Sequence, residues 1–149
     1  MKTRINKITS TDTGLDTLPL RVGAGAIFAA HGAQKLFGWF GGYGLEGTAG
    51  WMASIGLEPG LLMAVLAGSA EFFGGLLLVF GLLVRPIALL LAITMVVAIV
   101  TVHLQNGLFM ANNGYEFGLA LLAVSVALGL RGAGSLSADQ LLLAQLAKK

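Results

Sequence analysis

Apolar residues fill four long stretches of the chain, separated by short segments rich in glycine or charge. The stretches run over residues 18–37, 61–84, 86–103 and 114–130. A helix needs about 20 residues to cross the hydrocarbon core of a bilayer, and each stretch is near that length if the last has interfacial ends. Arg85 and Pro86 leave almost no room between the second and third stretches, so these two helices should form a tight hairpin. The pattern predicts an all-α protein, an integral membrane bundle of four transmembrane helices.

Two shorter helices are predicted outside these stretches. Residues Gly47–Gly56 lie between a glycine-rich turn and Pro59, and we expect them to form a short helix on the outer interface. Ser137 and Gln140 have the spacing of a capping box ahead of several leucines. This spacing predicts an amphipathic C-terminal helix that lies along the cytoplasmic surface.

Lysines and arginines mark one side of the predicted bundle. They gather on the side that holds both termini: Lys2, Arg4, Lys7, Arg21, Arg85, Arg131, Lys148 and Lys149. Only Lys35 lies toward the other side, so the positive-inside rule places both termini in the cytoplasm. We therefore divide the chain into a flexible cytoplasmic arm (residues 1–17), the four-helix domain (18–130) and an amphipathic tail (131–149).

Composition agrees with a membrane protein and removes several other classes. Of the 149 residues, 56% are hydrophobic and 11% are charged, whereas soluble domains carry about 25% charged residues. The positive residues form no stripe with stacking aromatics, so we expect no nucleic-acid partner. The chain has no cysteine, which excludes disulfides, thiolate metal sites and thiol relays. Any redox role would be at most that of a non-thiol oxidoreductase subunit, which borrows a cofactor or a partner.

The first apolar stretch is the least lipid-like of the four, because it contains Arg21, His31, Gln34 and Lys35. It should be buried among its neighbours. Its small residues recur every four positions, a spacing that lets another helix approach closely: Gly25, Ala29 and Ala33. His31 and Lys35 are also four residues apart, so they share one helical face that should look inward.

Glu71 lies near the middle of the second stretch. An ionised group at the centre of a transmembrane helix costs roughly 2.5–3.5 kcal/mol, so Glu71 should face the bundle and either pair or stay protonated. Antiparallel packing of the first two helices makes Lys35 and His31 the best partners. His103 and Glu116 fall near the outer ends of the third and fourth helices. Together these positions predict a polar pocket that opens outward.

Each of these residues also has a simpler interpretation. Long cationic side chains near helix ends often reach the interface, which favours a structural or topological role for Arg21 and Arg85. Lys35 and Glu116 also lie near helix ends and would suit a solvated interfacial role, and His31 would suit a hydrogen bond between helices. We expect no metal, because carboxylate-bridged bundles use a Glu-x-x-His pair on one helix and the sequence has none.

The spaced motifs together resemble the DoxX family of small bacterial membrane proteins. They are Arg21-Val-Gly-Ala-Gly, His31-Gly-Ala-Gln-Lys-Leu-Phe-Gly38, Glu71-Phe-Phe-Gly-Gly75 with Gly81, and Glu116. The resemblance covers residues 18–130 and implies four transmembrane helices in the bacterial cytoplasmic (inner) membrane. It also implies a link to quinone-dependent redox complexes, and it assigns the family's Arg, His/Lys and Glu positions to Arg21, His31, Lys35 and Glu71.

Three functions are compatible with these features. The first is a subunit of a membrane redox complex that binds a quinone or a similar lipophilic molecule, with His31 or Lys35 donating to it and Glu71 or Glu116 exchanging a proton. His103 would line the same pocket. The second is a small-solute carrier or binding module that uses the pocket, although carriers usually show internal repeats and this chain does not. The third is a structural anchor for a soluble oxidoreductase, or a self-associating scaffold in the bilayer.

Overall fold

The computed structural model describes residues 14–147, and this part of the chain is helical with no strand. The all-α class is therefore confirmed. The long helices are α2 (Thr17–Phe37), α4 (Gly60–Phe80), α5 (Val84–Ala98) and α6 (Glu116–Arg131), and the shorter ones are α3 (Gly44–Ser54) and α7 (Ala138–Ala147). Short turns of other helix types are η1 (Trp39–Gly41), η2 (Ile99–His103), η3 (Leu104–Asn106) and η4 (Met110–Asn112). Most of the predicted N-terminal arm, residues 1–13, lies outside the described residues, as do Lys148 and Lys149.

The four long helices occupy the four predicted apolar stretches. In the part of the chain that the structure describes, two helices are long and apolar enough to cross a membrane: α4, and α5 together with its continuation to Asn106. α2 has the same length as α4 but carries two cations, Arg21 and Lys35, as well as His31, and α6 has 16 residues. Four membrane crossings therefore stay a prediction.

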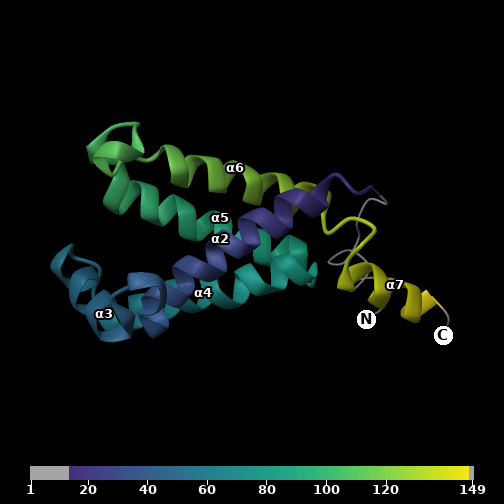
Figure 1. Ribbon diagram of the computed structural model, residues 1–149, viewed down its shortest axis with the longest axis horizontal. Helices are drawn as coiled ribbons and strands as arrows, with labels where there is room; N and C mark the ends of the chain where they lie inside the picture. Colours follow the sequence, from purple (N-terminus) through teal and green to yellow (C-terminus); the bar gives the residue numbers. More distant parts are fainter. Residues whose placement is uncertain (1–13, 148–149) are drawn as a thin grey trace.

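The helices pack as two pairs, α2 with α4 and α5 with α6 (Figure 1). The pairs lie together at the end of the molecule that carries α7 and spread apart toward the end that carries α3 (Figure 1). We refer to these as the α7 end and the α3 end. α4 and α5 form the expected tight hairpin, because α4 stops at Phe80, where Gly81 takes a left-handed conformation (φ 69°), and α5 begins at Val84.

Glycines let α2 and α4 touch backbone to backbone. A Cβ added to Gly25 would lie 2.7 Å from the carbonyl oxygen of Gly75, and one added to Gly32 would lie 2.6 Å from the Cα of Phe72. Gly25 belongs to the small-residue row that predicted a close helix contact, so that prediction is confirmed. The contact fixes the register of α2 on α4, and thus decides which polar residues meet.

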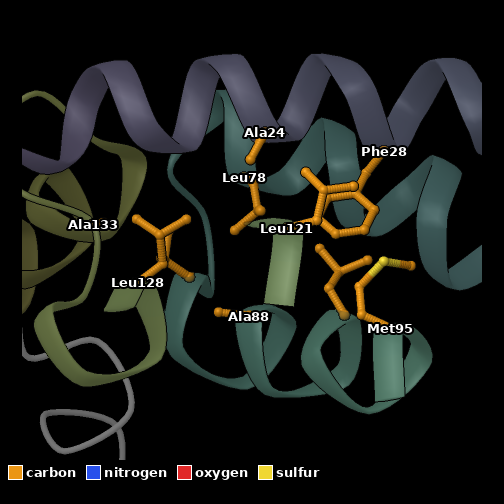
Figure 2. Close-up of a cluster of buried hydrophobic side chains, with 10 residues drawn as sticks. Ala24, Phe28, Leu78, Ala88, Met95, Leu121, Leu128 and Ala133 are labelled. Atoms are coloured by element: carbon orange, nitrogen blue, oxygen red, sulfur yellow. The ribbon is translucent and has the colours of Figure 1, made fainter. Parts of the chain in front are cut away.

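A compact apolar core joins the two pairs (Figure 2). Its centre holds Phe28 of α2, Leu78 of α4, Leu91 of α5 and Leu128 of α6, each almost fully buried. Met95 and Leu121 extend the core toward the α3 end. Close packing of these side chains holds the pairs together at the end where they do not diverge.

The α7 end is closed by a network around Arg21, which is 2% exposed. Its guanidinium donates to the carbonyl oxygens of Ala133 (3.0 Å), Val79 (2.6 Å), Leu78 (3.3 Å) and Leu136. The side chain therefore turns into the protein and does not extend outward from the helix. The reason is that the last carbonyls of α4 lack helical partners and the segment before α7 folds over them, so the guanidinium satisfies both.

The tail also caps α5. Asp139, at the start of α7, accepts hydrogen bonds from the backbone N–H groups of Leu83 (2.8 Å) and Val84 (3.1 Å), and its own N–H donates to Gly81. A carboxylate is favourable at the N-terminus of a helix. Ser137 accepts from the N–H of Gln140 at 3.3 Å, which confirms one half of the predicted capping box. The predicted tail is thus anchored to the helices through Asp139.

Candidate functional site

The centre of the candidate site is an ion pair between α2 and α4. Lys35 Nζ lies 2.5 Å from Glu71 Oε2, and the exposed fractions of the two side chains are 25% and 5%. Lys35 is in the last turn of α2, and Glu71 is near the middle of α4, three residues from a glycine that accommodates the α2 side chains. The close glycine contact therefore brings the expected partners together and leaves the carboxylate with almost no contact with solvent.

The ion pair lines an inner cavity of about 230 Å³ that lies between the two helix pairs. The apolar part of its wall comes from α2, α5 and α6 and includes Phe28, Met95, Ala98, Phe117, Gly118 and Leu121. Its polar part is His31, Lys35, Glu71, His103 and the segment 113–114, with Met110 nearby. The inner cavity lies toward the α3 end, where the pairs diverge.

The two histidines of the chain both line this inner cavity. The His31 ring contacts Phe117 of α6, with 5.9 Å between the ring centres, and His31 itself is exposed at the cavity edge. His103 ends the π-helical turn η2, and its Nδ1 lies 2.9 Å from the carbonyl oxygen of Asn113. Such turns occur often at functional sites because they displace side chains from the regular helical positions.

Glu116 is not part of this group. Its Oε1 accepts a hydrogen bond of 2.6 Å from the backbone N–H of Met110, and its own N–H donates to the carbonyl of Leu108. Glu116 thus fixes the connection between η3 and α6, and it does not line the inner cavity. Of the five predicted ligand-binding or proton-exchanging residues, the structure brings together His31, Lys35, Glu71 and His103.

A second hollow, which we name the vestibule, lies on the other side of Lys35. It has a volume of about 260 Å³ and is lined by Gln34, Lys35, Gly41, Gly42, Tyr43, Thr48 and Trp51. Thr48 of α3 donates from its hydroxyl to the carbonyl of Lys35 at 3.3 Å. The short helix predicted at Gly47–Gly56 is found as α3, which begins three residues earlier, and it forms one wall of the vestibule.

The remaining predicted cation, Arg85, lies at the other end of the molecule. Its guanidinium donates to the carbonyl of Gly129 at 3.3 Å and so links α5 to α6. In residues 14–147, no three histidine, aspartate or glutamate side chains gather in a way that would hold a metal ion. The arrangement instead offers hydrogen-bond donors, a carboxylate and two imidazoles around a largely apolar space.

Sequence reasoning missed the part of the site contributed by Thr48, Met95 and Phe117. Met95 and Phe117 are ordinary apolar residues within apolar helices, and no spacing distinguishes them from core residues. Thr48 is a small polar residue in a segment that was assigned to the interface. Thr48 could be assigned to the site only from its position in α3, once the packing of α3 against both α2 and α4 was known.

These features define a class: a small helical protein whose diverging helix pairs enclose a polar cavity beside a buried ion pair. Residues 17–104 match the DoxX family, and the chain belongs to that family.

The chain is also similar to two other bacterial proteins along most of its length. The chain is 40% identical over 125 residues to "Putative oxidoreductase CatD" of Bacillus subtilis (strain 168), covering 84% of this chain and 85% of that protein. It is 30% identical over 138 residues to an uncharacterized protein of Haemophilus influenzae, covering 91% of this chain and 89% of that protein. No solved structure matches the chain significantly.

Proposed function

We propose that the chain spans a bacterial cytoplasmic membrane four times, with both termini in the cytoplasm. The outward faces of the long helices support this proposal, because they carry large exposed apolar side chains: Leu61, Leu66, Phe73, Leu89, Ile93, Val100, Leu119 and Val126. α2 turns its polar residues toward α4, α6 and the tail, so its charges are not a barrier to insertion. In this orientation the α7 end is cytoplasmic, and the vestibule and the inner cavity lie in the outer half.

Within the membrane we propose that the inner cavity binds a quinone or a similar lipophilic molecule, as part of a redox complex. The single observation that carries the proposal is the ion pair of Lys35 and Glu71 in the wall of a largely apolar cavity. Buried titratable groups in such a cavity are typical of binding sites. The name of the Bacillus subtilis relative, "Putative oxidoreductase CatD", agrees with a redox role.

The residues present fit the head group of such a ligand. A cavity of about 230 Å³ is smaller than the sites of drug-sized ligands, so it suits a single ring system. Lys35 and His31 would donate hydrogen bonds to ring oxygens, while Phe28 and Phe117 would contact the ring. Glu71 would give or take the proton that accompanies reduction or oxidation, and His103 would bind at the far wall. A bound quinone would supply the electron-accepting chemistry that the chain's own residues lack.

Ligand-induced stabilisation tests this function. Purified protein in detergent is heated with a short-chain ubiquinone, with menadione or with neither, and the melting temperature is recorded. We expect the quinones to raise the melting temperature of the wild type, since a ligand that binds only the folded state stabilises it. Glu71→Gln and Lys35→Met should abolish the shift. Glu46→Gln is the matched control, because Glu46 is exposed on α3 and lines neither hollow. No shift with either quinone would contradict the proposal.

We also propose that a soluble oxidoreductase or another subunit completes the complex. The chain has no cysteine for thiol chemistry, and residues 14–147 contain no group of side chains that could hold a metal ion. Crosslinking in intact cells followed by mass spectrometry tests this part. Recovery of a flavin- or metal-containing oxidoreductase would support it, and recovery of copies of this chain alone would favour the homo-oligomer.

A further inference from the structure

Lys35 separates the two hollows near the α3 end. Of the residues that line the inner cavity and those that line the vestibule, Lys35 is the one common to both. The vestibule is bounded by α3 and the turn at Gly41 and Gly42, whereas the inner cavity is bounded by α5 and α6. The side chain of Lys35 therefore forms the boundary between the two spaces.

The two members of the ion pair differ in their access to solvent. The carboxylate of Glu71 is 5% exposed, and the side chain of Lys35 is 25% exposed. Thr48 fixes the backbone carbonyl of Lys35 from the vestibule side, but the flexible four-carbon stem stays able to rotate. Of the pair, Lys35 is thus the residue that reaches both the vestibule and the buried carboxylate.

We propose that Lys35 carries protons between the vestibule and Glu71. In one direction, the ammonium group gives a proton to the carboxylate, which leaves a neutral amine and a neutral carboxylic acid. The amine then takes a proton from a hydronium ion in the vestibule, so that one proton has moved inward. The 2.5 Å between Lys35 Nζ and Glu71 Oε2 allows this transfer to be direct. This inference rests on the proposed function only for the use of the proton, not for its route.

Other titratable groups lie on the elements near the pair. His31 lies on α2 and His103 on η2, and both line the inner cavity. Tyr43 lines the vestibule, and Glu46 is exposed in the first turn of α3. Glu116 at the start of α6 is held by Met110. His31 and His103 are the competing routes: His31 is exposed and interacts electrostatically with both Lys35 and Glu71, and His103 lines the same cavity.

The test follows the protonation of Glu71 in ligand-free protein in lipid nanodiscs. For each variant, a stopped-flow pH jump crosses the midpoint of Glu71 protonation, and infrared spectroscopy records the change. The band of the Glu71 carboxyl group is identified by its loss in Glu71→Gln. Lys35→Arg keeps the positive charge, but arginine does not release its proton in proteins, so we expect protonation to slow on the order of tenfold or more. Lys35→Met should be equally slow, and His31→Gln and His103→Gln should both match the wild type. A Lys35→Arg variant as fast as the wild type, or a slow His31→Gln or His103→Gln variant, would overturn the proposal.

A second measurement leaves Lys35 in place, in case the Lys35 variants do not fold. Because the chain has no cysteine, Tyr43→Cys introduces a unique thiol that a bulky reagent modifies at the vestibule. Modification should slow Glu71 protonation by about the same factor as Lys35→Arg does, because the bulky group would separate Lys35 from the solvent in the vestibule. Phe109→Cys is the matched control, because Phe109 is exposed in the η3–η4 connection and lines neither hollow. Equal rates for the two modified proteins would exclude the vestibule as the source, whether or not a quinone binds.

Discussion

Arg21 and Lys35 are cations on the same helix, and their surroundings assign them different tasks. Arg21 donates to four neutral carbonyl oxygens, whereas Lys35 meets one carboxylate at the boundary of two hollows. The planar fork of arginine suits several acceptors at once and keeps its charge, while a lysine amine is able to release a proton. Arg21 is therefore a structural residue in this fold, and Lys35 is the residue of the pair suited to proton chemistry.

Replacing Arg21 should unfold the α7 end. Arg21→Met leaves buried carbonyls without donors, and we expect the free energy of unfolding to fall by about 3 kcal/mol. Arg21→Lys should recover only part of this loss, because one ammonium does not reach all four acceptors. Denaturant titration in mixed micelles measures the difference. Asp16→Asn, which removes the exposed ion pair with Arg131, serves as the control and should cost less than about 1 kcal/mol. Equal losses for Arg21→Met and Asp16→Asn would contradict this account.

Individual residues of the site differ in how far the sequence predicted them. The pairing of Glu71 with Lys35 followed from a buried carboxylate in a helix that lies antiparallel to a polar neighbour. The partners of Arg21 did not, because they are backbone carbonyls, and two of them lie more than 110 positions away along the chain. Glu116 was expected in the pocket from its depth alone. Its actual partner is a backbone N–H in the adjacent connection, which no side-chain pattern marks.

At the scale of elements, the contact between α2 and α4 positions the site. Gly25, Gly32, Gly68 and Gly75 face the partner helix where a Cβ would overlap it. The row of small residues in α2 predicted this contact, and the apolar stretches predicted the helices themselves. The docking of the tail was not predicted, because the capping of α5 by Asp139 depends on where the hairpin between α4 and α5 places its N–H groups.

Adding one methyl group at this contact should disrupt both stability and the site. Gly32→Ala would place its Cβ against the backbone of Phe72, which cannot yield as a flexible side chain would. We expect α2 and α4 to separate, the free energy of unfolding to fall by about 1–3 kcal/mol, and the quinone-induced melting shift to shrink. Gly23→Ala, on the same helix with open space around it, should stabilise the protein by about 0.5–1 kcal/mol. The pair is compared by thermal melting, and a neutral Gly32→Ala would show that the close contact is not required.

At the scale of the whole molecule, the two helix pairs lie together at the α7 end and spread apart toward the α3 end (Figure 1). The Arg21 network, the tail and the core close the α7 end. The inner cavity and the vestibule lie at the α3 end, where the pairs diverge. This division places rigid packing on the proposed cytoplasmic side and polar, accessible chemistry on the proposed outer side. A ligand or a partner that acts on the site would therefore approach from the outer half of the membrane.

The proposed orientation has a direct test, because the natural chain has no cysteine and single thiols report their own position. Tyr43→Cys lies between α2 and α4, Phe109→Cys between α5 and α6, and Leu136→Cys beyond α6, and all three positions are exposed. We expect a membrane-impermeant thiol reagent to label the first two in intact bacterial spheroplasts, and to label Leu136→Cys only after the membrane is permeabilised. The expectation follows from four crossings with the positive residues inside. If Leu136→Cys is labelled from outside together with Phe109→Cys, then α6 does not cross the membrane. If Tyr43→Cys and Phe109→Cys are protected while Leu136→Cys is labelled, the orientation is inverted and the vestibule faces the cytoplasm.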